Sequence, residues 1–105
     1  MRRGTTYRLN FKVAADLTGC DEIHIAFQNK KEQIIKKYPE LASTIQNEDG
    51  STTVTTVLTQ VDTLSFRAGT PVTCQLRCRK GDDAYGTPIY TLTESVDPVI
   101  EDAVI

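Results

Sequence analysis

Apolar and polar residues alternate with a period of two along most of this chain. Residues 7–13 read YRLNFKV and residues 22–28 read EIHIAFQ. Successive side chains of a β-strand point to opposite faces, so each stretch predicts a half-buried strand. Turn-forming residues separate such stretches at short intervals. The predicted strands are, in order, residues 7–13, 22–28, 32–38, 41–46, 51–59, 72–79 and 87–96.

Residues 32–38 also fit a helix, because Ile34, Ile35 and Tyr38 would share one helical face. Strands are predicted on both sides, and Pro39 follows directly. Lysine and proline are common on edge strands, where they oppose pairing with other chains. An edge strand is therefore the favoured interpretation of this segment.

Three further segments are predicted to lie outside strands. Thr59 and Asp62 have the spacing of a capping box, which predicts one short helical turn. Residues 80–86 are polar and predict a loop. Asp97 and Pro98 can cap and begin a last helical turn that runs to Ile105.

These elements predict an all-β fold, an immunoglobulin-like antiparallel β-sandwich of about seven short strands. A length of 105 residues suits one domain. We expect residues 1–96 to form the sandwich and residues 97–105 to form an apolar and acidic segment. The predicted core consists of Tyr7, Leu9, Phe11, Ile25, Phe27, Leu64, Phe66 and Leu76.

The chain carries a net charge of −2, which argues against a nucleic-acid partner because such proteins usually present a strongly basic patch. No apolar run is long enough for a membrane span, so no membrane partner is expected. Synthesis in the cytoplasm is the expected localisation. Charge is nevertheless uneven, since residues 1–12 carry four basic side chains and no acid, whereas residues 81–105 carry acids and no Lys or Arg. Opposite ends could attract within a chain or between copies.

Candidate chemistry is sparse. The single histidine, His24, alternates with isoleucines and is predicted on the polar face of a strand. Its spacing from Cys20, Cys74 and Cys78 does not fit a structural zinc site, and all three thiols are predicted to be free. The adjacent Asp82 and Asp83 fall short of a calcium loop. No catalytic, cofactor-binding or metal-binding residues are therefore predicted, and no enzymatic activity.

Short matches over most of the chain resemble a family of small uncharacterised prophage proteins of Gram-positive bacteria. The matching parts are the opening Met1–Thr6, Leu58-Thr59-Gln60, Asp62-Thr63-Leu64, Phe66, Ala68-Gly69, residues 72–79, and the tail around Asp97, Val104 and Ile105. Residues 38–41 extend a stretch that is shorter in the family. The resemblance implies a gene in the tail or baseplate region and no catalytic residues.

Two kinds of function follow as hypotheses. One is a structural or assembly protein of a phage tail or baseplate, present in the virion, whose partners are copies of itself or other tail proteins. The other is a protein- or carbohydrate-binding sandwich module, for which Tyr38, Tyr85 and Tyr90 are the candidate exposed aromatics. Residues 97–105 either cap their own domain or dock on a neighbouring copy, with their acids meeting basic residues of the first segment.

Overall fold

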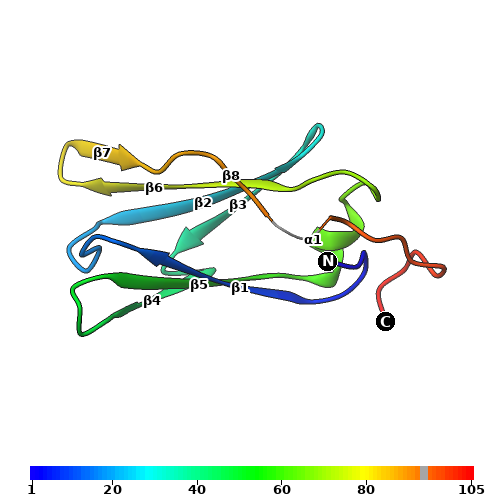
Figure 1. Ribbon diagram of the computed structural model, residues 1–105, viewed down its shortest axis with the longest axis horizontal. Coiled ribbons are helices and arrows are strands. Elements are labelled where there is room, and N and C mark those ends of the chain that lie inside the picture. Colours follow the sequence, from blue (N-terminus) through cyan, green and yellow to red (C-terminus); the bar gives the residue numbers. More distant parts are fainter. Residues whose placement is uncertain (93–94) are drawn as a thin grey trace.

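Two antiparallel sheets face each other in the computed structural model, which describes residues 1–92 and 95–105 (Figure 1). The first sheet has the order β1-β5-β4, formed by Tyr7–Val13, Thr52–Leu58 and Ala42–Gln46. The second has the order β3-β2-β6-β7, formed by Glu32–Tyr38, Glu22–Asn29, Thr73–Lys80 and Asp83–Gly86, and β8 (Tyr90–Thr91) also pairs with β6. The predicted all-β sandwich is confirmed. Its immunoglobulin-like character stays a prediction.

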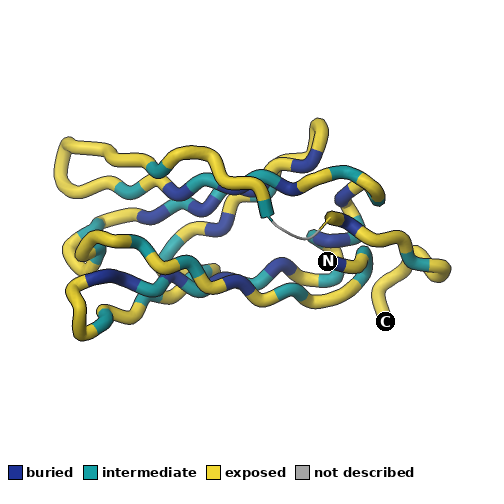
Figure 2. The backbone as a smooth tube through the Cα atoms, in the orientation of Figure 1, coloured by how far each residue is buried: buried dark blue, intermediate teal, exposed yellow. Residues whose placement is uncertain are grey.

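Burial follows the alternation of the sequence. On β2, Ile23, Ile25 and Phe27 are buried while the residues between them are more exposed. On β5, every second residue from Thr52 to Leu58 is buried, although two of these four are threonines (Figure 2). The central strands of both sheets therefore turn one face inward. The predicted edge strand at residues 32–38 is confirmed as β3, at the end of its sheet.

The core lies between the two sheets. Of the eight predicted core residues, Leu9, Ile25, Phe27, Phe66 and Leu76 are buried together, and Tyr7 and Phe11 pack against them at partial burial. The assignment of Leu64 to this core is wrong. Leu64 ends helix α1 (Gln60–Leu64) and lies beside Gly4, within 3.3 Å of where a Cβ on that glycine would be.

The capped turn at Thr59 is confirmed as helix α1 (Gln60–Leu64). The Thr59 side chain accepts a hydrogen bond from the Asp62 backbone, and the Asp62 carboxylate accepts one from the Thr59 backbone at 2.8 Å. Asp62 also pairs with the buried Lys36 of β3, with 2.6 Å between Nζ and Oδ2. This ion pair links the helix that follows the first sheet to the edge of the second.

The predicted polar loop at residues 80–86 is too long. Strand β6 continues to Lys80, and β7 begins at Asp83 and pairs back as far as Gly86. The return strand expected over residues 87–96 is interrupted after β7. Thr87 remains bonded to Leu76, and pairing resumes at Tyr90–Thr91, whereas residues 93 and 94 lie outside the described part of the chain.

The helical turn predicted for residues 97–105 is wrong. Asp97 forms a parallel β-bridge with Arg2, and its backbone N–H donates to the Met1 carbonyl at 2.7 Å. Its own carbonyl accepts from the Arg3 backbone at 3.0 Å. The Asp97 carbonyl, which would accept the first hydrogen bond of a helix, is thus bonded to Arg3 instead. Within the described residues, no helix has the length and apolar character needed to cross a membrane.

Candidate functional site: an apolar pocket on the open side of the sandwich

One side of the sandwich is bounded by β1 in the first sheet and by β7 and β8 in the second (Figure 1). Among the described strands, β1 pairs with β5 and β7 pairs with β6, so no described strand covers residues 8–13 of β1 or the outer edge of β7 on this side. Near the termini the gap is closed, because residues 1–3 run beside residues 95–97. There Met1 N donates to the Ser95 carbonyl at 2.9 Å.

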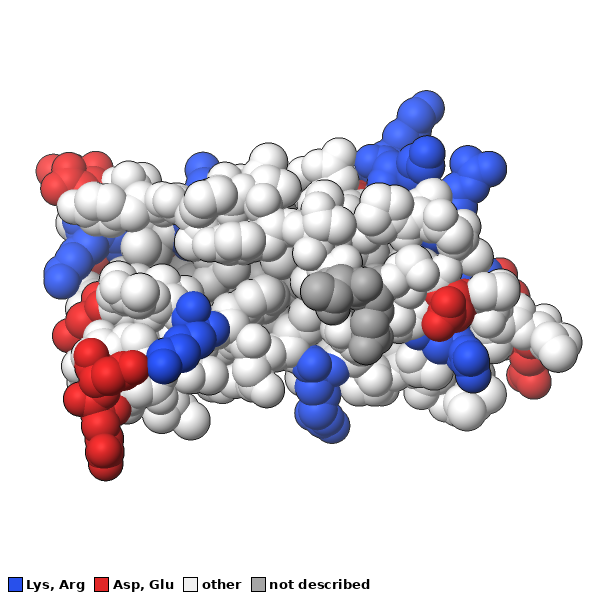
Figure 3. All heavy atoms as spheres, viewed as in Figure 1, with Lys and Arg blue, Asp and Glu red and all other residues white. Residues whose placement is uncertain are grey.

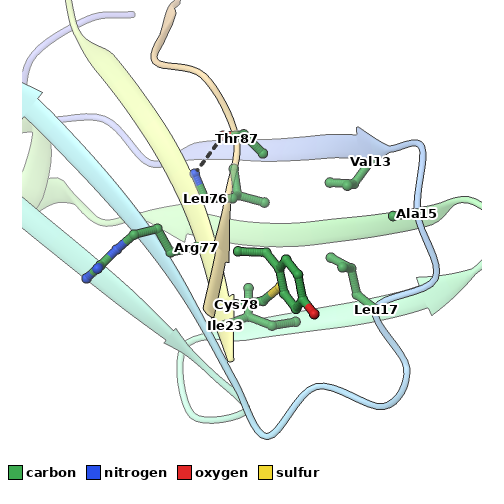
Figure 4. A pocket seen from close by; sticks show the side chains of 10 residues that line it. Val13, Ala15, Leu17, Ile23, Leu76, Arg77, Cys78 and Thr87 are labelled. Atoms are coloured by element: carbon green, nitrogen blue, oxygen red, sulfur yellow. Dashed lines mark hydrogen bonds between the residues drawn. The ribbon is translucent and has the colours of Figure 1, made fainter. Parts of the chain in front are cut away.

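At the other end of this side the two sheets leave a hollow of about 170 Å³. We call it the open-side pocket. It is lined by Val13, Ala15, Leu17, Ile23, Leu76, Arg77, Cys78, Tyr85, Gly86 and Thr87. Figure 4 shows Val13, Ala15 and Leu17 on one wall, opposite Leu76, Cys78 and Ile23, whereas the Arg77 side chain points away. The pocket therefore presents mostly aliphatic carbon and sulfur.

The first wall is held in place by Thr52, at the start of β5. Its side chain is fully buried and donates to the Ala15 carbonyl at 2.9 Å. The same oxygen accepts a hydrogen bond from Leu17 N at 3.0 Å. One hydroxyl thus satisfies two backbone groups of the loop between β1 and β2 and keeps Leu17 turned toward the pocket.

The second wall depends on where regular pairing of β7 with β6 ends, at Gly86 and Thr87. Gly86 has no side chain, and a Cβ there would already touch Arg77 at 3.4 Å. Thr87 accepts a hydrogen bond from Leu76 N at 3.1 Å, and its own N–H donates to the Leu76 carbonyl at 2.9 Å. A side-chain oxygen and a backbone bond thereby take the place of regular ladder pairing. The pocket remains open between this segment and β1.

Two positive side chains lie on the outer face of β1. Arg8 and Lys12 occupy the exposed phase of this strand, on either side of the neutral Asn10. Lys12 pairs with Asp49 at 3.0 Å. Hydrogen bonds from Ser51 to the Asp49 carboxylate, supported by Lys12, hold the pKa of that carboxyl well below its usual range. The β1 edge therefore combines an apolar inner phase with a positive outer phase. In the view of Figure 3, most charged side chains lie toward the two ends of the molecule.

The three cysteines are free thiols. Cys78 lines the open-side pocket, and Cys74 lies in the core. Burial, assisted by a hydrogen bond with Cys78, raises the pKa of the Cys20 thiol to about 11. Burial also raises the pKa of Cys74. Because the thiolate is the reactive form, Cys20 and Cys74 are poor nucleophiles at neutral pH.

The other residues considered from the sequence do not converge on one place. His24 is half-buried on the outer face of β2, with Nε2 3.7 Å from a Glu22 oxygen. Asp82 and Asp83 lie at the exposed hairpin between β6 and β7. In the described ranges, no three His, Cys, Asp or Glu side chains gather closely enough to hold a metal ion.

Tyrosines were the candidate aromatics for a binding surface. Tyr38 is half-buried, while Tyr85 and Tyr90 are 57% and 48% exposed. Sequence reasoning placed Tyr85 at a loop tip, but it lies in β7 opposite Cys78 and lines the open-side pocket. Ala15, a small residue two positions after β1, lines this pocket, and the strand pattern did not convey that.

Fold and site together define a β-sandwich with one open apolar side. No protein-family model matches the chain, and no curated protein matches it either.

Proposed function

We propose that this protein is a non-catalytic structural or assembly protein that binds other protein chains through its open side. The observation that supports this most directly is an apolar pocket beside two strand edges, residues 8–13 of β1 and β7, that no other described strand covers. Free edges are templates on which an extended segment of another chain can add as a strand. Backbone hydrogen bonds then give affinity, and a pocket for an inward side chain gives specificity.

The resemblance to prophage proteins supports a place in a phage tail or baseplate. Such particles are built from repeated protein contacts, for which a small sandwich with a built-in docking edge is well suited. The alternative of a carbohydrate-binding module is less favoured. Apart from the Tyr85 and Thr87 hydroxyls, the pocket offers few polar groups that could bind a sugar.

Strand order supports the further proposal that the sandwich is immunoglobulin-like. If β1 is strand B, the orders β1-β5-β4 and β3-β2-β6-β7 correspond to B-E-D and C′-C-F-G. Residues 1–3, which run parallel to residues 95–97, then take the place of a short first strand. An experimental structure with a different strand order would contradict this assignment.

The test of the proposed function is to look for the chain in particles. A photo-crosslinking amino acid is placed at Ala15, which lines the pocket, and at the neighbouring Ala14, which is also exposed but does not line it, as the matched control. We expect the chain in purified phage particles from its own host, with a defined crosslink from position 15 and none from position 14. Particles that form normally and contain no copy of the chain would contradict the proposal.

A further inference from the structure

The segment of residues 98–105 exposes apolar side chains that a folded domain normally buries. Ile100 and Ile105 are 106% and 91% exposed, and Val104 is 54% exposed. The contacts that hold this segment are polar. Arg3 pairs with Asp102 at 2.9 Å, and the Gln60 side chain bonds to the N–H and the carbonyl of Ile105 at 2.8 and 3.2 Å. The aliphatic side chains are therefore free to enter another surface.

The segment and the open-side pocket lie toward opposite ends of the long axis. In Figure 1 the segment, in red, leaves the sandwich beside the N-terminus, whereas the hairpin between β6 and β7 and the loop after β1 lie at the far end. Pairing of Asp97 with residues 1–3 fixes where the segment starts. From there the chain runs away from the end of the sandwich that holds its own pocket (Figure 1).

Charge favours this segment over a second copy of β1 as the occupant. If two β1 edges paired antiparallel about Asn10, Arg8 of each copy would face Lys12 of the other, and like charges directly opposite each other are destabilising. Residues 97–105 contain Asp97, Glu101 and Asp102 and no basic residue. Among these acids, Asp102 can face the same way as Arg8 and Lys12 and complements their charge.

The alternation fits over the last four residues of the segment. If Ala103 and Ile105 point inward, Asp102 and Val104 point outward, because neighbouring side chains of a strand face opposite ways, and the added strand stops short of Glu101, which would otherwise point inward. Asp102 would then lie beside Arg8 and Lys12, having left Arg3. Arg3 is 20% exposed but keeps its bonds to the Phe66 and Leu64 carbonyls after Asp102 leaves. Gln60 also releases Ile105, and backbone bonds to β1 replace that pair.

We infer that residues 102–105 of one copy add to the β1 edge of the next copy at its pocket end, beside residues 10–13, and place Ile105 in the open-side pocket. This inference rests on the proposed function and names the partner as a second copy of the chain. The two surfaces are different, so the contact is head-to-tail and generates rings or filaments. A copy in the middle of such an assembly uses its pocket and its tail at once.

The test uses two full-length variants, each with one surface damaged. Ala15→Arg puts a charged side chain at the pocket wall, and its matched control is Ala14→Arg on the adjacent exposed residue. Ile105→Asp damages the tail, and its matched control is Ile45→Asp, at a position 64% exposed on β4. Molar mass is measured by light scattering or sedimentation over a range of concentrations, and circular dichroism checks that each variant folds.

We expect the unmodified chain and both controls to form concentration-dependent oligomers. Ala15→Arg and Ile105→Asp should each weaken self-association at least about 10-fold, since one lost aliphatic contact is worth about one decade in affinity. Mixed together, they should form dimers and nothing larger, because one intact tail meets one intact pocket. Oligomers that both variants retain, or an unmodified chain that stays monomeric, would overturn the inference. The crosslinking from Ala15 in particles would still decide the proposed function separately.

Discussion

A single buried hydroxyl, that of Thr52, positions one wall of the open-side pocket. Replacing it by valine keeps the volume and removes the bonds to Ala15 and Leu17. Leaving buried backbone groups without partners costs about 1–3 kcal/mol. We therefore expect Thr52→Val to fold with lower stability in urea and to expose the loop between β1 and β2 to faster hydrogen exchange.

Thr56→Val is the matched control for this change. Thr56 is buried on the same strand, but its hydroxyl donates to the Leu41 carbonyl, on the side of β4. It should lose comparable stability without faster exchange in residues 14–21. Equal exchange in that loop for both variants would show that Thr52 does not hold the pocket wall.

The ion pair of Lys36 and Asp62 should make the stability of the fold depend on pH in the acidic range. Burial acts to raise the Asp62 pKa, but hydrogen bonds from Lys36 and the Thr59 backbone outweigh it and lower the pKa below the usual value. A carboxyl whose folded pKa is depressed stabilises the fold above its unfolded pKa, and this contribution is lost as pH falls through the folded pKa. Below roughly pH 4, stability should therefore fall more steeply for the unmodified chain than for Lys36→Met.

Asp62→Asn tests the same pair at neutral pH. The substitution leaves the ammonium of Lys36 buried without its counter-charge, which costs about 3 kcal/mol or more. Lys36→Met should cost less than half as much, because the carboxylate keeps its bond to Thr59. Urea unfolding measures the free energy of unfolding of both variants. A smaller loss for Asp62→Asn than for Lys36→Met would show that the buried Lys36 ammonium does not depend on the Asp62 carboxylate.

At the scale of elements, the sequence predicted strands β1 and β2 from the alternation of apolar and polar residues, and β5 from its richness in Thr and Val. The structure places all three close to the predicted bounds. The Thr59 cap was equally local, since it depends on residues three apart. By contrast, the early start of β7 could not be predicted, because Asp83–Gly86 is exposed throughout and has no apolar phase.

The prediction of a helical turn at residues 97–105 was wrong for a different reason. A helix cap at Asp97 is a local expectation, but the backbone of this residue is bonded to Met1 and Arg3, more than ninety positions earlier. Long-range pairing outweighed local preference. The open-side pocket is likewise non-local, since its walls come from the loop after β1 and from β6 and β7.

Removal of residues 98–105 separates the two roles considered for this element. The aliphatic side chains of Ile100, Val104 and Ile105 are largely exposed, so the truncation should leave the melting temperature within a few degrees of the full chain. Self-association should be lost. A large fall in melting temperature at unchanged molar mass would instead show that the segment caps its own domain.

At the scale of the whole molecule, the sandwich is closed near its termini by the pairing of residues 1–3 with residues 95–97 and open at the far end. On the opposite side of the sandwich, β3 and β4 contact each other. Strand β3 is also followed by Pro39, which cannot donate a backbone hydrogen bond to another strand. We therefore expect assembly on the β1 side.

The most direct test of this account is hydrogen exchange measured by mass spectrometry on the unmodified chain at low and high concentration. The account predicts that peptides covering residues 7–17 and 98–105 become protected as concentration rises, while peptides covering β3 and β4 do not change. Protection confined to β3 and β4, with residues 7–17 exchanging at one rate throughout, would contradict the claim that the open side is the assembly surface.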